Sequence, residues 1–356
     1  MFARLVGQDR LKHYFIKILA SGKMPHSFLL YGPEGVGKTA AALELAQIIT
    51  CYNEEKRPCG VCASCVKFRT MTHPDVMLFF PVPGSLKPEA VQTIREEIVS
   101  NPYRRILLQK NASLHIDMVR EIKHRLRLQS YQGRGRVIVL LDCESLTIDA
   151  SNALLKILEE PPPDVTMILT TTAIESIIPT VRSRCQPLQL SYLSIDTISE
   201  ALYNQEGISA EDARYYASLS GGSYTRAAEY FQEEFKEMTQ HCSDILQCCC
   251  EKPLPHTFDL VNIITEKHNL DEIKSILELL IALLKQRFER TVLEQSNQRT
   301  FELFKLPESF PILNTSVVGL VIDEIENSVD LLNKNVYLNL VLIILFFRLR
   351  KILRNE

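Results

Sequence analysis

Short apolar runs alternate with helix-patterned stretches through the first half of the chain. The runs expected to form strands are residues 27–31, 76–80, 137–141 and 165–170. Between them, the stretch 117–128 places Met118, Ile122 and Leu126 four residues apart, which is the spacing of one helical face. This alternation predicts an α/β fold class in which a parallel sheet is covered by helices.

The pattern changes near Leu190, where strand signals fade and helical spacing takes over. Two later stretches carry an apolar stripe that fits one face of a helix. The stripes consist of Ile273, Ile276, Leu277, Leu280 and Leu284, and of Ile322, Ile325, Val329 and Leu332. Because such stripes must be buried, the last third is predicted to be an all-α bundle. We expect three domains, namely 1–188 with the sheet, a small helical domain at 189–235 and a helical domain at 236–356.

The stretch that begins at Gly32 reads GPEGVGKT and lies between a strand-like run and a run of helix formers. This order is typical of a phosphate-binding loop, which offers backbone N–H groups at a helix N-terminus. Lys38 is expected to reach the β- and γ-phosphates, and Thr39 to offer its hydroxyl to Mg²⁺. Gly35 and Gly37 permit a close backbone approach. ATP or ADP with Mg²⁺ is the predicted ligand, and a chance match in a Gly-rich turn is the alternative.

Four of the ten cysteines are clustered. Cys51, Cys59, Cys62 and Cys65 have the spacing C-x7-C-x2-C-x2-C. Four thiolates at such spacing are typical of a closed, tetrahedral structural Zn²⁺ site with no position for a catalytic water. Free core cysteines are the alternative, although they seldom repeat in this way. The consecutive thiols at 248–250 diverge on a helix and are expected to pack as small hydrophobic groups.

Composition narrows the class of protein. The 356 residues are 46% hydrophobic and 23% charged, and the formal net charge of −3 provides no overall basic field for nucleic acid. Any contact with DNA must therefore be local or shared with partners. The apolar run 340–347 is too short to span a bilayer and predicts a buried helix. The first residues lack the apolar stretch of a secretion signal, so we expect a cytoplasmic protein.

Further motifs accompany the phosphate loop and the cysteines in a fixed order. They are Val6-Gly7-Gln8, RVIVLLDCE at 136–144, SNALLKILEEPP at 151–162, Ser183-Arg184-Cys185, and GGSYTRA at 221–227. Together they resemble the AAA+ ATPase subunits of the bacterial DNA polymerase III clamp loader. The resemblance is dense over residues 1–230 and weaker over the helical last third.

The resemblance implies a fold and a set of roles. The fold would be an AAA+ P-loop domain with a zinc module at 51–65, a helical lid domain and a C-terminal collar domain. Asp142, Thr171 and Arg226 would contact the nucleotide together with the phosphate loop. Arg184 would act in trans as an arginine finger in the neighbouring subunit's ATP site, because a planar guanidinium suits developing phosphate charge. The partners would be gamma/tau and delta subunits, the sliding clamp and, through the assembled complex, primer–template DNA.

One position departs from the active ATPases of this family. Active members carry adjacent Asp and Glu, which order Mg²⁺ and polarise the attacking water, whereas here Asp142 is followed by Cys143. If the motif is counted back from Asn152 instead, Leu141 takes the metal-binding position and Asp142 the catalytic one. Each register lacks one group unless Glu144 enters through a local bulge. We therefore expect nucleotide binding with poor turnover.

Two subunit types of the family fit these motifs. The spacing before Arg226, and the absence of the long extension typical of tau, favour delta-prime, a stator that supplies Arg184 to its neighbour. A gamma-type subunit that hydrolyses ATP itself with Asp142 and Glu144 is the alternative. A third possibility is an unrelated phosphate-loop enzyme whose zinc knuckle binds nucleic acid, aided by basic residues within 123–136.

Overall fold

The computed structural model describes the chain in two compact units. The residues left outside the description are 85, 106–111, 128–134, 233, 294–303, 305, 308, 311–314, 335 and 355–356. The first unit contains Met1–Gly207 and Gly222–Thr225, and the second contains Ile208–Gly221 and Arg226–Glu356. The division into three domains at 188 and 235 stays a prediction.

The first unit is built on a five-stranded parallel sheet. In chain order the strands are β1 (Ser27–Tyr31), β2 (Val76–Phe79), β3 (Arg136–Leu140), β4 (Val165–Thr171) and β5 (Gln186–Gln189). Their order across the sheet is β2-β3-β4-β1-β5, and all neighbouring pairs are parallel. Strands β1 to β4 are buried almost throughout, which explains why the sequence shows continuous apolar runs rather than alternation.

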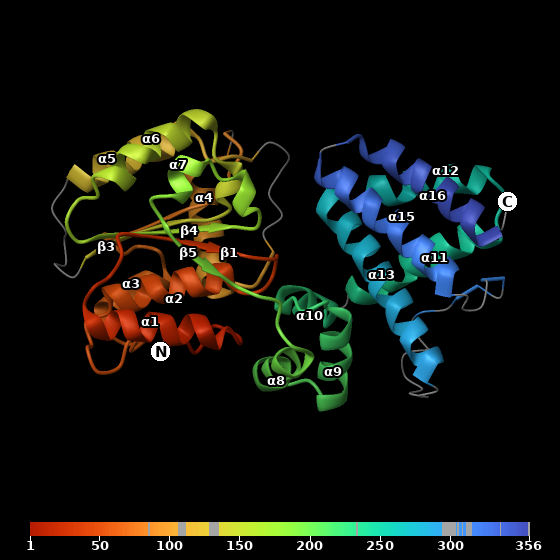
Figure 1. The fold of residues 1–356 in the computed structure, drawn as a ribbon, viewed down its shortest axis with the longest axis horizontal. Helices are drawn as coiled ribbons and strands as arrows, with labels where there is room; N and C mark the ends of the chain where they lie inside the picture. Colours follow the sequence, from red (N-terminus) through yellow and green to blue (C-terminus); the bar gives the residue numbers. More distant parts are fainter. Residues whose placement is uncertain are drawn as a thin grey trace. The chain divides into compact units, whose positions relative to one another are not determined.

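Helices cover both faces of this sheet. On one face lie α1 (Asp9–Ser21), α2 (Lys38–Thr50) and α3 (Ala63–Arg69), and on the other lie α5 (Ile116–Arg127), α6 (Ile148–Glu159) and α7 (Pro179–Arg182) (Figure 1). The other elements of the unit are α4 (Pro88–Ser100), α8 (Ile195–Glu206) and the 3₁₀ turns η1 (Cys143–Ser145) and η2 (Ile174–Ser176). Leu29 and Ile138 of the sheet share one buried cluster with Ile122 and Leu154 of the helices. The core therefore lies between the layers, as the pattern of the sequence requires.

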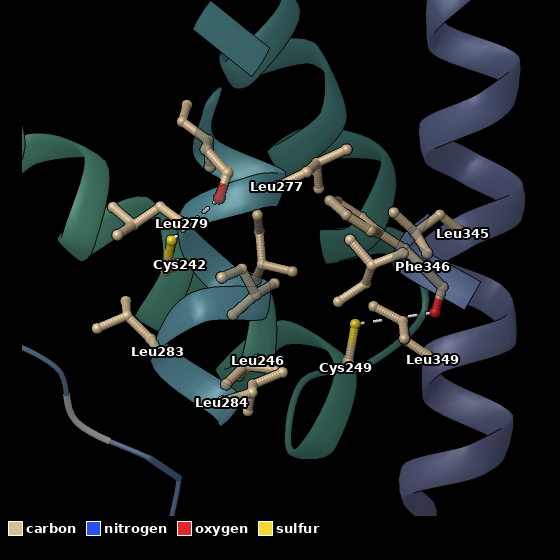
Figure 2. Close-up of a cluster of buried hydrophobic side chains, with 14 of the residues drawn as sticks. Cys242, Leu246, Cys249, Leu277, Leu279, Leu283, Leu284, Leu345, Phe346 and Leu349 are labelled. Atoms are coloured by element: carbon tan, nitrogen blue, oxygen red, sulfur yellow. Dashed lines mark hydrogen bonds between the residues drawn. The ribbon is translucent and has the colours of Figure 1, made fainter. Parts of the chain in front are cut away.

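The second unit is helical in all of its described elements. These are α9 (Ala210–Leu219), α11 (Glu234–Cys250), α12 (Pro255–Lys267), α13 (Leu270–Leu293), α15 (Thr315–Asn333) and α16 (Leu338–Arg354), while α10 (Tyr224–Tyr230) begins in the first unit. Leu277 of α13 and Leu345 of α16 belong to its buried cluster, part of which Figure 2 shows. The α/β architecture expected from the sequence, a parallel sheet covered by helices and followed by helical regions, is confirmed.

The cysteines of α11 pack into this helical core. The Cys249 thiol donates to the carbonyl oxygen of Phe346 at 3.8 Å, as Figure 2 shows, and Cys248 lies 3.7 Å from the hydroxyl of Thr257. All three residues from Cys248 to Cys250 are buried. Cys248 and Cys249 contact different residues, so these cysteines pack as small side chains of the helical core, as expected.

Two features differ from the sequence prediction. Strand β5 was not predicted, because Gln186-Pro187-Leu188-Gln189 is short and polar; as an edge strand it tolerates a proline. The apolar run at 340–347, expected to be a buried helix, is only half buried: Val341 and Leu345 are in the core, whereas Leu340 and Ile344 are 51% and 42% exposed.

Within the described residues, no helix has the length and apolarity needed to cross a membrane.

Candidate nucleotide pocket and cysteine cluster

The predicted phosphate loop connects the carboxyl end of β1 to the N-terminus of α2. Gly32 has a φ of 147°, and a Cβ atom there would lie 2.2 Å from the carbonyl oxygen of Leu190. Gly37 caps α2 with a φ of 103°, and a Cβ atom there would lie 2.9 Å from the Tyr103 hydroxyl. Both positions need glycine, because other residues combine a strained backbone with a steric clash. The strand, loop and helix therefore have the order that phosphate binding requires.

Lys38 is buried at the first position of α2 and folds back over the loop. Its Nζ donates to the carbonyl oxygens of Gly32 and Pro33 at 2.9 and 2.7 Å. Burial lowers the pKa of Lys38, and the carboxylates of Asp142 and Glu144 partly oppose that shift. A desolvated ammonium beside two carboxylates can bind an anionic phosphate and lies close to groups that attract Mg²⁺.

Asp142 lies just beyond β3 and lines the same pocket as Lys38 and Thr39. Its backbone N–H donates to the Thr170 hydroxyl at 3.1 Å, and its φ of 50° belongs to the left-handed region, which Asp tolerates. Burial raises the pKa of Asp142 to about 6, with Glu144 as the next contribution. The side chain is thus a half-buried carboxylate in the cavity wall, placed to approach a bound cation.

Cys143 and Glu144 behave differently from each other. The Cys143 thiol is buried, donates to the Leu140 carbonyl oxygen at 3.5 Å and belongs to the cluster between the sheet and α6. Glu144 accepts hydrogen bonds from the backbone N–H of Thr172, at 3.0 Å, and from the Thr172 hydroxyl. Its second oxygen is buried and has no hydrogen-bond partner within the described part of the chain. The residue after Asp142 therefore faces the core, and the nearest second carboxylate is held by Thr172.

The described part of the chain forms a cavity of about 170 Å³ next to Lys38 and Asp142. Its walls include Gly35, Gly37, Lys38, Thr39, Tyr103, Arg105, Asp142, Thr172 and Thr225. Tyr103 accepts a hydrogen bond from the backbone of Val6 at 2.8 Å, and the amide of Gln8 donates to the carbonyl oxygen of Val36 at 3.1 Å. The N-terminal motif therefore supports the loop from behind.

Two other residues, Thr171 and Arg226, were expected to bind or sense nucleotide. Thr171 is fully buried, and its hydroxyl accepts a hydrogen bond from Ala173 N at 3.1 Å; the cavity wall is formed instead by the next residue, Thr172. Arg226 belongs to the second unit, where it pairs with Glu278 at 2.7 Å. Thr225, its neighbour, donates from its backbone N–H to the Gly35 carbonyl oxygen at 3.3 Å. The roles of Thr171 and Arg226 stay predictions.

Arg184 lies at the other end of the sheet. It precedes β5, and its carbonyl oxygen accepts a hydrogen bond from Ser27, the first residue of β1, at 2.6 Å. The guanidinium pairs with Glu159 at 2.7 Å and donates to the Thr180 carbonyl oxygen at 2.9 Å. Its side chain is 35% exposed and takes no part in the wall of the cavity. A planar cation is thus held near the surface, remote from this chain's own phosphate loop.

The four clustered cysteines meet as their spacing predicts. All four sulfur atoms lie within 4.8 Å of one another, and those of Cys59 and Cys65 are 4.0 Å apart. Sulfur ligands of one tetrahedral Zn²⁺ ion lie about 3.8 Å apart, as follows from Zn–S bonds of about 2.3 Å. The backbone N–H of Cys62 points at the Cys59 sulfur at 3.3 Å. Hydrogen bonds from Val61 and Cys62 lower the pKa of Cys59 to about 6. The residues present fit Zn²⁺.

A hydrogen-bonded support lies behind the cysteine cluster. Ser64, next to Cys65, donates to the Thr50 carbonyl oxygen at 2.7 Å and lies 3.0 Å from Nε2 of His73. Both side chains are buried. The module therefore joins the end of α2 to α3 and leaves the phosphate loop untouched, which suits a structural metal.

The basic stretch proposed as a nucleic-acid surface is partly engaged elsewhere. Arg125 pairs with Glu121 at 2.7 Å, and Arg136 donates to the Leu126 carbonyl oxygen at 2.9 Å. Residues 128–134, including Arg134, lie outside the described residues. The described part of the stretch thus has the ion pairs of an ordinary helix surface.

Comparison with known proteins agrees with the fold and the motifs. The family model described as "DNA polymerase III, delta subunit" matches residues 7–194. The chain belongs to this family.

Relatives of the family differ in subunit type. The delta' subunit of DNA polymerase III from Bacillus subtilis is 27% identical over 230 residues, which cover 65% of this chain and 61% of that protein. The delta' subunit from Escherichia coli is 31% identical over 62% of this chain and 60% of that protein. The gamma/tau subunit from Mycobacterium bovis is 32% identical over 62% of this chain but covers only 34% of that protein. The chain thus matches less than two thirds of each relative.

Sequence reasoning missed several residues of the pocket. Tyr103 and Thr225 line it from distant parts of the chain, and Gln8 supports the loop through Val36. Gln8 and Thr225 lie in motifs that were recognised without this role, and no short motif marks Tyr103. Thr172 was passed over for its neighbour, although the alternation of side chains along a strand is a signal that distinguishes the two. The structure therefore shows residues that contact the phosphate loop from distant parts of the chain, which local sequence patterns do not predict.

Asp142→Asn is expected to stabilise the protein in a pH-dependent way. Because the folded-state pKa of Asp142 is raised to about 6, the stability of the wild type is fully present below about pH 4 and falls as the pH rises through about 6. The neutral variant avoids this loss, so its free energy of unfolding should exceed that of the wild type by about 2–3 kcal/mol at pH 7.5 and by little at pH 4. Urea titrations across this range measure the difference; parallel pH profiles for the two proteins would contradict the assignment.

Cys62→Ser is expected to remove one equivalent of zinc per chain. Serine provides no thiolate, so the charge-transfer absorption of Co²⁺ substituted at the cluster should disappear. Hydrogen exchange should quicken across 51–65 more than around Lys38, because the metal organises this module. Cys250→Ser, a buried cysteine outside the cluster, is the control. Unchanged zinc content and exchange in the Cys62 variant would exclude a metal held by these thiols.

Proposed function

We propose that the chain is the delta-prime subunit of a DNA polymerase III clamp loader. It would act as a stator that supplies Arg184 to the ATP site of a neighbouring subunit while the sliding clamp is loaded onto primed DNA. The observation that carries this proposal is the placement of Arg184 and the phosphate loop at opposite ends of one parallel sheet.

The distance between the two ends explains why the arginine cannot serve its own site. Phe28 of β1 pairs with Gln186 of β5, so the residues before both strands lie at the amino edge of the sheet. The phosphate loop follows Tyr31 at the carboxyl edge, five strand residues farther on. At about 3.3 Å per residue the strand separates the two groups by about 16 Å. A role in trans is therefore the favourable use of an exposed guanidinium here.

The contacts of Arg184 also suit an arginine finger. Glu159, at the end of α6, and the Thr180 carbonyl oxygen hold its guanidinium in one orientation. Holding a planar fork in place reduces the entropy lost when it engages a second, more highly charged anion such as a triphosphate. The ion-pair partner of Arg184, Glu159, belongs to the LLKILEEPP motif, so two motifs of the family resemblance meet at this surface.

The chain's own pocket supports nucleotide binding more strongly than hydrolysis. The phosphate loop, Lys38 and Asp142 line one cavity. A hydrolytic site also needs a group that polarises the attacking water, and Cys143 points into the core instead. We therefore propose that ATP or ADP with Mg²⁺ binds here and that turnover is weak.

Family membership supports the proposed partners. The other subunits would be gamma/tau and delta, which together with this chain would form the ring that opens the clamp. Contact with primer–template DNA would be shared with these partners, because the net charge of −3 provides no basic field of the chain's own.

A gamma-type ATPase is the second candidate, and one observation favours it. Glu144 lies close enough to Lys38 and Asp142 to affect the pKa of each, and one of its oxygens is buried with no hydrogen-bond partner among the residues that the structure describes. A rotation that released Thr172 would bring this carboxylate into the cavity as a base. Turnover by the isolated chain separates the two candidates.

The isolated chain is expected to bind a fluorescent ATP analogue but to hydrolyse ATP negligibly. Lys38→Ala should weaken the binding, because it removes the cation that faces the phosphates, and should leave the residual hydrolysis unchanged. Phosphate release and fluorescence titration measure the two properties. Robust turnover that Lys38→Ala and Glu144→Gln both abolish would establish the gamma-type candidate instead.

Arg184→Ala is expected to lower ATP hydrolysis by the reconstituted complex without preventing its assembly. Loss of an arginine finger costs about 10³ to 10⁵ in rate in other phosphate-loop enzymes, and the effect on the whole complex should be smaller because several sites contribute. Arg184→Lys should fail as well, since a point charge cannot replace the planar fork.

The matched control for this experiment is Arg182→Ala. Arg182 lies two residues away, is similarly exposed at 38%, and pairs with Glu175 on the surface. Clamp-stimulated hydrolysis should be compared at equal assembly, which gel filtration verifies. Equal rates for the Arg184 variant, the Arg182 variant and the wild type would reduce Arg184 to a structural ion-pair partner of Glu159.

A further inference from the structure

A second group of metal-ligating side chains lies in the helical unit, away from the cysteine cluster. Glu237 and His241 are four residues apart on α11, and His268 follows the end of α12. The Nε2 atoms of the two histidines are 3.1 Å apart, and Oε1 of Glu237 lies 3.8 Å from Nε2 of His241. The three potential ligand atoms all lie within 4.8 Å of one another.

We propose that Glu237, His241 and His268 bind a divalent transition-metal ion, with Zn²⁺ as the expected occupant. Ligand atoms of a tetrahedral zinc ion lie about 3.4 Å apart, because Zn–N and Zn–O bonds are about 2.0–2.2 Å long. The observed separations of 3.1 and 3.8 Å bracket this value. Two imidazoles and one carboxylate form a donor set that suits zinc over the hard cations Mg²⁺ and Ca²⁺. The site goes beyond the proposed clamp-loader function and does not rest on it.

A neighbouring carboxylate sets the orientation of His268. Its Nδ1 lies 3.2 Å from Oε2 of Glu272, an oxygen that also accepts the backbone N–H of Asn269 at 3.1 Å. With the proton on Nδ1 shared with Glu272, the Nε2 lone pair of His268 points towards His241. A carboxylate behind a ligating histidine fixes the ring and increases its basicity, as at many zinc sites.

His241 is placed as a donor inside the helical unit. It is buried on α11, and its Nε2 lies 3.1 Å from Nε2 of His268 and 3.8 Å from Oε1 of Glu237. Its Nδ1 is buried and has no hydrogen-bond partner among the described residues. Nδ1 of His241 is therefore left without the hydrogen bond that a buried polar atom usually makes, whereas its Nε2 lies near the other two proposed ligands.

The surrounding charges and exposure allow an ion to enter. Glu237, Glu272 and Asp244 contribute negative charge near the histidines, and Lys267, whose Nζ is 3.9 Å from Glu237, opposes them from a largely exposed position. Glu237 is 56% exposed, so the fourth coordination position opens to water. A bound ion would join α11 to the junction of α12 and α13 and so fasten the helical unit.

Zinc content of the full-length chain tests the site. Wild-type protein and His268→Gln, equilibrated with a buffered excess of Zn²⁺ and then freed of unbound metal, should differ by one equivalent per chain. The difference is independent of what the cysteines bind. His256→Gln changes an exposed histidine of α12 outside the group and should keep the wild-type content. Melting in a chelator verifies that each variant folds.

Glu272→Gln separates a positioning role from a purely structural one. It should weaken Zn²⁺ binding at this site by about 10- to 100-fold while leaving the metal-free melting temperature nearly unchanged. Zinc affinity is followed by competition with a chromophoric chelator. Equal zinc content in wild type and His268→Gln, or equal affinity in wild type and Glu272→Gln, would overturn the proposal.

Discussion

The parallel pairing of β1 with β4 and β5 is the constraint on which the first unit depends. It places β1 inside the sheet, where its backbone is bonded on both sides and its side chains are buried. The loop after β1 is thereby held rigidly at the carboxyl edge, next to the residues that follow β3 and β4. The same pairing fixes the residues before β5 at the amino edge. One short strand thus positions both Lys38 and Arg184 and keeps them apart.

This separation places the nucleotide pocket and Arg184 at opposite edges of the sheet. At the carboxyl edge, Lys38 is a buried cation and Asp142 a half-buried carboxylate. Burial lowers the pKa of Lys38 and raises that of Asp142, so it favours the neutral form of each. Such a pair can hold a nucleotide and its cation without completing the machinery for hydrolysis, because Cys143 lies in the core. At the amino edge, Arg184 and Glu159 need no nucleotide of their own. Under the proposed function, such a subunit would contribute Arg184 to a neighbour's reaction while its own pocket turned over slowly.

Local patterns predicted the parts of the molecule that are buried and close in sequence. The strand at Ser27–Tyr31 has the expected ends, and the helix at Lys38–Thr50 follows the phosphate loop as expected. The four cysteines converge because a short excursion can bring them together. Strand β5 was missed because its pairing partner, rather than its own polar sequence, makes it a strand. Contacts such as that of Gln8 with Val36 depend on chain segments folded onto the loop from a distance, which spacing does not reveal.

The same reasoning applies to the helical unit. The apolar stripe of α13 was predicted and is buried, since helical periodicity alone determines which face must be covered. The group around His241 and His268 was not predicted, because the two histidines are 27 residues apart and only the turn after α12 joins them. The one local signal was the four-residue spacing of Glu237 and His241. Sequence patterns therefore predict elements and compact motifs well, and sites assembled between elements poorly.

The central claim is that Arg184 reaches the nucleotide of a neighbouring subunit, and site-specific photocrosslinking tests it most directly. The photoreactive amino acid p-benzoylphenylalanine would replace Arg184 in a complex reconstituted with gamma-type subunits, and the crosslinked peptides would be mapped by mass spectrometry. The account predicts crosslinks to the neighbour's phosphate loop and to the carboxylate-bearing segment beside it. Crosslinks confined to this chain, or to surfaces of the neighbour away from its phosphate loop, would contradict the account.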